Sequence, residues 1–164
     1  MNMGMISHRT EKGRTVKESG FKIGDILVGK TYMYRTQTYW YRVVGMTEKQ
    51  LKLKELNVSY PTKYMSNTPG DECMPVMEYW RQGDDKPGMK KRYMLFEGFP
   101  YWPGPRDKGV FKASIQRTRT IETFPGSEKE VKNDWEYEAV LIGDRYGPHT
   151  LELWNGEPGW VNCD

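Results

Sequence analysis

Seven basic and aromatic residues in the middle of the chain have the chemistry to hold a nucleic acid. Residues 81–119 contain ten Lys or Arg and four Asp or Glu. Cationic side chains bind phosphate, and aromatic rings interleaved with them stack on bases, which is how small β-barrels hold single strands. The candidate residues for single-stranded nucleic-acid binding are Lys90, Lys91, Arg92, Arg117, Arg119, Tyr93 and Trp102.

The last third of the chain has the opposite charge. Residues 120–164 contain ten Asp or Glu and three Lys or Arg. An acidic flank can occupy the basic nucleic-acid channel of a host nuclease, while exposed aromatic residues anchor the interface. A plain solvated surface explains the same charges, and rim packing explains the same rings, so both alternatives stay open. The protein-binding candidates are Glu122, Glu128, Glu130, Asp134, Glu136 and Glu138, together with Tyr32, Tyr34 and Arg35 where the chain turns between two strands.

Residue patterns typical of catalysis or metal binding are missing from the sequence. His8 and His149 lie far apart, as do the two cysteines, so no zinc site is expected. Neither a GxxxxGK[ST] phosphate loop nor a GxSxG nucleophile turn occurs. The carboxylate pair Asp84-Asp85 falls in a Gly/Pro turn, where solvation is the ordinary reason for it. We expect a protein without cofactor or catalysis, and retain a small hydrolase with two facing carboxylates as the second alternative.

The stretch from Gly24 to Leu56 predicts the elements that position these residues. It contains an apolar run, an aromatic segment ending in Val43-Val44, and the alternation Leu51-Lys52-Leu53-Lys54. Alternation with a period of two between turn residues is typical of half-buried antiparallel strands. We therefore expect a meander of three strands that opens a curved sheet.

The rest of the chain continues in short strands separated by Pro and Gly. Val110–Thr123 alternates most clearly: Phe111, Ala113 and Ile115 share a face that Arg117 and Arg119 continue, so this strand should leave the core toward a rim. The whole pattern predicts an all-β or mainly β fold, either a small curved antiparallel sheet or an SH3-like barrel with long loops. Residues 1–20 lack periodicity and are expected to form a mobile leader before a single β domain over residues 21–164.

Two parts of the sequence carry a recognisable pattern. GDILV (Gly24–Val28), Gln37-Thr38, WYRVV (Trp40–Val44) and LKLKEL (Leu51–Leu56) open it, and LWNGEP (Leu153–Pro158) closes it. This pattern resembles a family of small β proteins encoded by tailed bacteriophages and prophages. The resemblance implies a phage or mobile-element origin and a compact β fold, and it supplies no catalytic residue.

The expected function follows from that origin and from the absence of catalytic patterns. We expect an accessory binding protein of a phage, most consistent with a counter-defence inhibitor of the anti-CRISPR kind that binds a host nuclease or its nucleoprotein complex. Single-stranded nucleic-acid binding is the alternative. With two cysteines and no long apolar run, the expected location is the reducing cytoplasm of a bacterial host cell, with no membrane partner.

Overall fold

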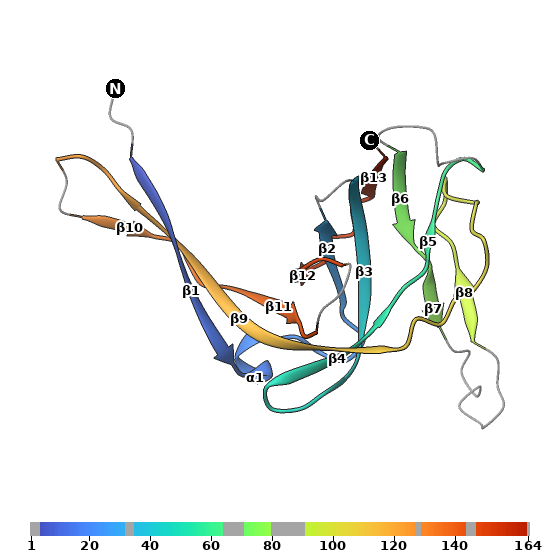
Figure 1. Cartoon of the computed structure of the whole chain (residues 1–164), viewed down its shortest axis with the longest axis horizontal. Coiled ribbons are helices and arrows are strands. Elements are labelled where there is room, and N and C mark those ends of the chain that lie inside the picture. Colours follow the sequence, from blue (N-terminus) through green and yellow to red (C-terminus); the bar gives the residue numbers. More distant parts are fainter. Residues whose placement is uncertain are drawn as a thin grey trace.

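The computed structural model describes residues 4–31, 35–63, 71–79, 91–126, 129–143 and 147–163. In these ranges the chain forms antiparallel strands and one short helix, so the all-β prediction is confirmed (Figure 1). The elements are β1 (Met5–Arg14), α1 (Val16–Ser19), β2 (Ile26–Thr31), β3 (Arg35–Met46), β4 (Gln50–Glu55), β5 (Val58–Ser59), β6 (Asp71–Pro75), β7 (Met77–Tyr79), β8 (Arg92–Met94), β9 (Val110–Thr123), β10 (Glu130–Lys132), β11 (Glu136–Leu141), β12 (Thr150–Leu153) and β13 (Gly159–Cys163).

Six of the strands pair in a closed ring. Strand β2 pairs with β3, β3 with β4, β4 with β9, β9 with β11, β11 with β12, and β12 again with β2. The first three strands are the meander predicted from the sequence. The ring is not a simple barrel, because the sheet continues beyond it through β13, β6 and β5 on one side and through β1 and β10 on the other.

Alternate residues of these strands fill the inside of the ring. Leu51 and Leu53 of β4 are fully buried, and so are Ala113 and Ile115 of β9. Strand residues one position away from them therefore point outward. Helix α1 adds to this core through Val16, which is buried in the same cluster.

A second apolar cluster lies on the outer side of β3. Trp40 is fully buried there with Leu56, Cys73 and Val161, whereas its neighbour Tyr41 is fully buried inside the ring. Strands β5, β6 and β7 and the C-terminal strand β13 supply most of this cover. Strand β3 is thus covered on both faces, which explains why neither face of Tyr39–Val44 is polar in the sequence.

Strands β1 and β10 flank the far half of β9 and form an arm that projects from the ring (Figure 1). Residues 1–20 were expected to be a mobile leader, and for the described residues that expectation is wrong. Strand β1 pairs with β9 from Met5↔Thr123 to Arg14↔Ile115, and the next residue but one, Val16, is part of the core. The physical reason is that β9 is long enough to leave the ring with a free edge, on which β1 pairs.

Candidate nucleic-acid interface

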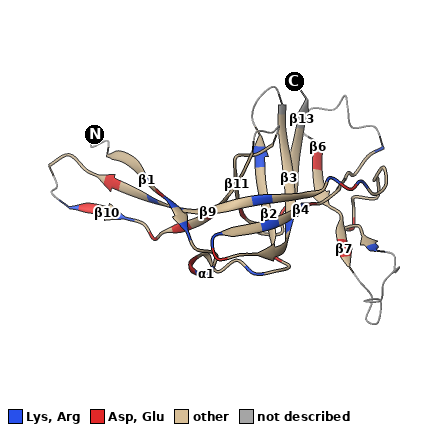
Figure 2. Ribbon diagram, turned by 60° about the horizontal axis from the view of Figure 1, so that its bottom comes forward, with Lys and Arg blue, Asp and Glu red and all other residues tan. Residues whose placement is uncertain are grey.

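Cationic side chains gather on the outer side of the ring where β3, β4 and β9 lie next to one another. Two rows of cross-strand neighbours run over these strands: Arg42, Lys54 and Val110 in one, and Gly45, Lys52 and Lys112 in the other. Figure 2 shows blue segments side by side on β4 and β9. We call the surface formed by Arg42, Lys52, Lys54, Lys91 and Lys112 the basic face.

Lys91 joins the basic face from the segment before β8, beside Lys54. A hydrogen bond with Lys91 lowers the pKa of Lys54, partial burial lowers it further, and the charge of Glu78 works against both. The same hydrogen bond raises the pKa of Lys91. Two amino groups this close repel each other when both are protonated, so an anion bound there would relieve the repulsion.

Carboxylates neutralise one end of the basic face and leave the other end open. The carboxylate of Glu78, only 6% exposed, lies 3.5 Å from Arg42 and 3.4 Å from Lys91. The pKa of Asp107 is lowered by a hydrogen bond from the backbone N–H of Gly109 and by the charge of Lys54. Lys52 and Lys112 are exposed and form no salt bridge within the described ranges. These two lysines are the accessible positive charge of the site.

The nucleic-acid residues predicted from the sequence do not form one site. Lys91 belongs to the basic face, and Arg92 is exposed on β8. Tyr93 and Trp102 pack against each other, with 5.0 Å between ring centroids, so their faces are partly used in that contact. Arg117 and Arg119 lie on β9 toward the arm, away from the basic face. Lys90 lies outside the described residues.

Arg117 and Arg119 form a cluster with Trp135 at the base of the arm. Their guanidinium carbons lie 4.2 and 4.4 Å from the centroid of the Trp135 ring, within cation–π range. Glu11 accepts hydrogen bonds from Arg117 at 2.7 and 3.0 Å, which raises the pKa of Arg117 and lowers that of Glu11. These contacts tie β1 to β9 and β11, so the cluster has a structural role.

The predicted acidic set is divided between two faces. Glu122, Glu136 and Glu138 point outward from β9 and β11, and Glu138 accepts a hydrogen bond from Thr118 at 3.0 Å. Glu130 pairs across from Thr123 on the other face and lies 3.8 Å from Lys132. Asp134 is exposed just before β11. Glu128, Tyr32 and Tyr34 lie outside the described residues, as does the side chain of Arg35.

Sequence analysis missed Lys52, Lys54 and Arg42 as binding residues, and it did not connect them with Lys112. The alternation on β4 does predict that Lys52 and Lys54 face away from the core. What the sequence does not show is that β4 pairs with β9, although residues 56–109 separate them in the chain. This pairing places Lys52 opposite Lys112. As long as that pairing is unknown, nothing in the sequence indicates that these four cations belong to one surface.

Comparison with known proteins finds no relative of this chain. Family models, curated proteins and solved structures were all searched, and none of them matches the chain. The resemblance to a phage family therefore stays a prediction. Among the described residues no group of three or more His, Cys, Asp or Glu could hold a metal ion. Nor does any helix there have the length and apolar character to cross a membrane.

Proposed function

We propose that this protein binds nucleic acid through the basic face. The observation that carries the proposal is the direct opposition of like charges on neighbouring strands, Lys52 across from Lys112 and Arg42 across from Lys54. Like charges in such positions destabilise a sheet. Phosphate groups bound over the strands would offset this repulsion, so the opposed cations are consistent with a site for the nucleic-acid backbone.

The composition of the basic face indicates contact with phosphate rather than with bases. Its cations are chiefly lysines, which bind phosphate as point charges, and its exposed apolar neighbours are Val44 and Val110. The aromatic residues of the predicted set pack elsewhere, so base stacking is not part of this interface. The proposed binding is independent of sequence and depends on salt, with a slope of log K against log salt of about −1.4 for the phosphate contacts of Lys52 and Lys112 on a single strand.

A charge-reversal pair tests the proposal. Fluorescence anisotropy with a labelled oligothymidylate is measured for the wild type and for Lys52→Glu/Lys112→Glu. We expect the double variant to bind at least tenfold more weakly and the salt slope to fall in magnitude by about 1.4, the share of two contacts. Lys17→Glu/Lys22→Glu is the matched control, because it changes the net charge equally on exposed residues outside the basic face. Equal losses in both variants would contradict the proposal.

A second candidate function rests on the acidic outer face of β11 and β12. Glu136 and Glu138 point outward on β11, and Glu152 points outward on β12, without a salt bridge among the described residues. Such a row can compete with nucleic acid for the basic channel of a host nuclease, as expected for a phage counter-defence inhibitor.

This second candidate has its own test. We expect the wild type to capture a host protein from nuclease-treated bacterial lysate. The variant Glu136→Lys/Glu138→Lys should no longer capture that protein, whereas Lys52→Glu/Lys112→Glu should still capture it. Capture that survives reversal of the acidic residues, or that disappears with the nuclease treatment, counts against inhibition through this face.

A further inference from the structure

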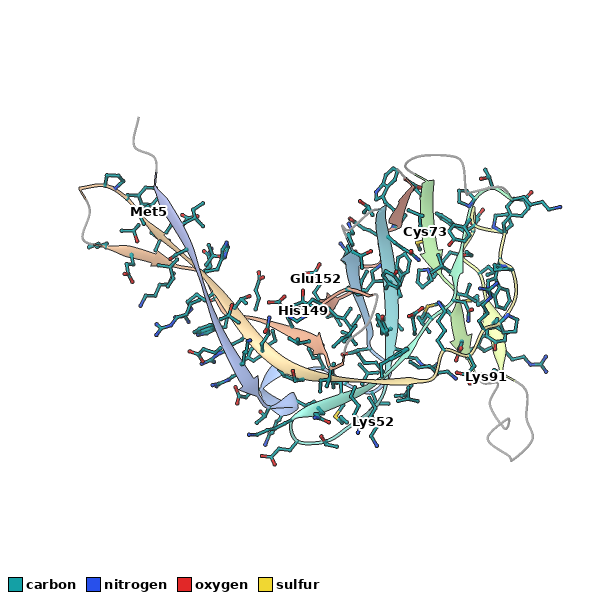
Figure 3. The ribbon with its side chains drawn as sticks, in the orientation of Figure 1. Met5, Lys52, Cys73, Lys91, His149 and Glu152 are labelled. Carbon is teal, nitrogen blue, oxygen red and sulfur yellow. The ribbon has the colours of Figure 1, made fainter. Side chains whose placement is uncertain are left out.

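Strand β1 leaves one edge of the large sheet open. It is the last strand of that sheet, and within the described ranges it pairs with β9 on one edge and with no strand on the other. Figure 3 shows Met5 at the far end of the arm, beyond the body of the ring. An open edge presents unpaired backbone N–H and C=O groups, which form a template for pairing with another chain.

The arm has no apolar core of its own to stabilise it. Among the described residues, none of β1 or β10 belongs to either apolar cluster. At the tip of the arm Met5 is 75% exposed and Ile6 is 64% exposed, and Phe124 and Val131 are exposed close by. A few strands are stable when an apolar face packs against another element. Exposed apolar side chains next to an open edge therefore indicate an interaction surface.

The charges on β1 are complementary to those of a second, antiparallel copy of β1. Arg9 and Glu11 are two positions apart on the strand, so they lie on the same face. When Thr10 of one copy lies opposite Thr10 of the other, Arg9 of each copy lies opposite Glu11 of the other. The two nearest symmetric registers instead place Arg9 opposite Arg9 or Glu11 opposite Glu11, and like charges in such positions are destabilising.

Both charged groups have bonding capacity left for these pairs. Arg9 is exposed, lies opposite Arg119 on β9 and forms no salt bridge within the described ranges. Glu11 accepts hydrogen bonds from Arg14 and Arg117 through Oε2, and its Oε1 accepts none from the described residues. A carboxylate from a second copy beside Arg9 would also offset the repulsion between Arg9 and Arg119.

The same register brings the arm tip of one copy to an apolar hollow of the other. Met5 then reaches the level of Thr15 and Val16, where β1 ends and α1 begins. A hollow of about 380 Å³ lies at this point, and its apolar lining comes from Val16, Phe21 and Met46. The exposed side chains of the tip thus have an apolar surface to cover, in addition to the charge match.

We propose that β1 is the interface with a second copy of this chain. The two β1 strands pair antiparallel about a two-fold axis at Thr10, and each arm tip covers the hollow beside α1 of the other copy. Regular pairing extends from Arg9 to Glu11, because a bulge follows between Glu11 and Arg14. The contact is small, so dimer formation depends on concentration, and it adds hydrogen bonds to β1 amides that are unbonded in the monomer. This inference is independent of the proposed nucleic-acid binding, since no residue of the basic face lies on β1.

Sedimentation velocity over a range of protein concentrations tests the dimer. We expect the wild type to dimerise as the concentration rises, and Arg9→Glu and Met5→Asp each to raise the dissociation constant at least tenfold. The first variant places carboxylates opposite Glu11, and the second places a charge against the apolar hollow. Lys52→Glu changes the net charge as Arg9→Glu does, on the basic face, and should dimerise as the wild type does. Because all three positions are exposed, circular dichroism should show the wild-type fold for each variant.

Disulfide crosslinking tests the register. In a Cys163→Ser background the remaining thiol, that of Cys73, is fully buried, so an added surface cysteine is the accessible one. Thr10→Cys should give a crosslinked dimer under mild oxidation, because directly opposite residues have Cβ atoms about 5 Å apart. His8→Cys is the matched control on the same exposed strand, and it should crosslink far more slowly, since His8 lies opposite Lys12 of the other copy.

Three results would overturn the proposal. One is a protein that stays monomeric up to its solubility limit. Another is a dimer that Arg9→Glu and Met5→Asp leave unchanged, which would place the interface on a different surface. The last is crosslinking of His8→Cys as fast as that of Thr10→Cys, which would mean a different register or random collisions.

Discussion

Trp40 and Tyr41 are neighbours on β3 that belong to different apolar clusters, and replacing each with Ala tests whether both clusters stabilise the fold. Both side chains are fully buried. A buried aromatic side chain removes roughly 200 Å² from water, which corresponds to about 5 kcal/mol at 25 cal/mol per Å². Measured losses for Trp or Phe to Ala are about 3–5 kcal/mol. We therefore expect Trp40→Ala to lower the free energy of unfolding by about 4 kcal/mol.

The expected loss of unfolding free energy for Trp40→Ala contains no contribution from a broken hydrogen bond, because Trp40 Nε1 has no hydrogen-bond partner among the described residues. Urea denaturation followed by circular dichroism measures the change, with the m-value checked for constancy. For a protein of this size, 4 kcal/mol corresponds to a fall in melting temperature of about 8–16 °C. Trp160→Ala is the matched control, because Trp160 is 44% exposed and should cost much less.

The result that would refute this reasoning is a loss below about 1 kcal/mol for Trp40→Ala. It would mean that strands β5, β6, β7 and β13 do not pack on β3 as the structure shows. If Tyr41→Ala lowers the free energy of unfolding by the expected amount in the same experiment, only the described packing of the outer cluster around Trp40 is wrong. Equal small losses for both variants would contradict the closed ring as well.

Three further predictions address backbone packing, the buried thiol and strand β1. Gly29→Ala should cost about 1–3 kcal/mol in urea denaturation, because a Cβ there would lie 2.7 Å from the carbonyl oxygen of Thr150, whereas Gly45→Ala meets only the flexible Lys52 side chain and should cost less. In a Cys163→Ser background, Cys73 should react with a thiol reagent at about pH 8 only after denaturation, since burial, with a smaller contribution from Glu72, raises its pKa to about 12; rapid reaction of the native protein would refute this. Because the pKa of this thiol in the folded state exceeds the value of about 8.5 in the unfolded state, unfolding releases its proton, and its contribution to stability is lost as the pH rises from about 8.5 toward 12. Hydrogen exchange should show protection of every second amide of β1, where a mobile leader would exchange at the rate of an unfolded chain throughout.

The strands of the ring could be predicted from the sequence because their burial alternates. On β4 the leucines face the core and the lysines face solvent, as the sequence pattern predicts. On β9 the inward face changes from Ala113 and Ile115 to Arg117 and Arg119, and these arginines are partly exposed at the base of the arm, as expected for a strand that leaves the core.

Strand β1 could not be predicted, because it pairs on a free edge and buries almost nothing. Its residues from Met5 to Thr10 are all exposed, so no apolar periodicity marks them as a strand. The basic face was missed for a different reason. Lys52 and Lys112 belong to strands that residues 56–109 separate in the chain, and only the pairing of β4 with β9 brings them together. Local patterns carry no information about such long-range pairs.

The proposed function is tested most directly by mapping where a nucleic acid contacts the protein. Backbone amide NMR spectra of the ¹⁵N-labelled protein are recorded during titration with an oligothymidylate at low salt. We predict that the shifted signals concentrate on the strands of the basic face, from Arg42 to Gly45, from Lys52 to Lys54 and from Val110 to Lys112. Signals that move only on β11 and β12, or no saturable change at any amide, would contradict nucleic-acid binding by the basic face.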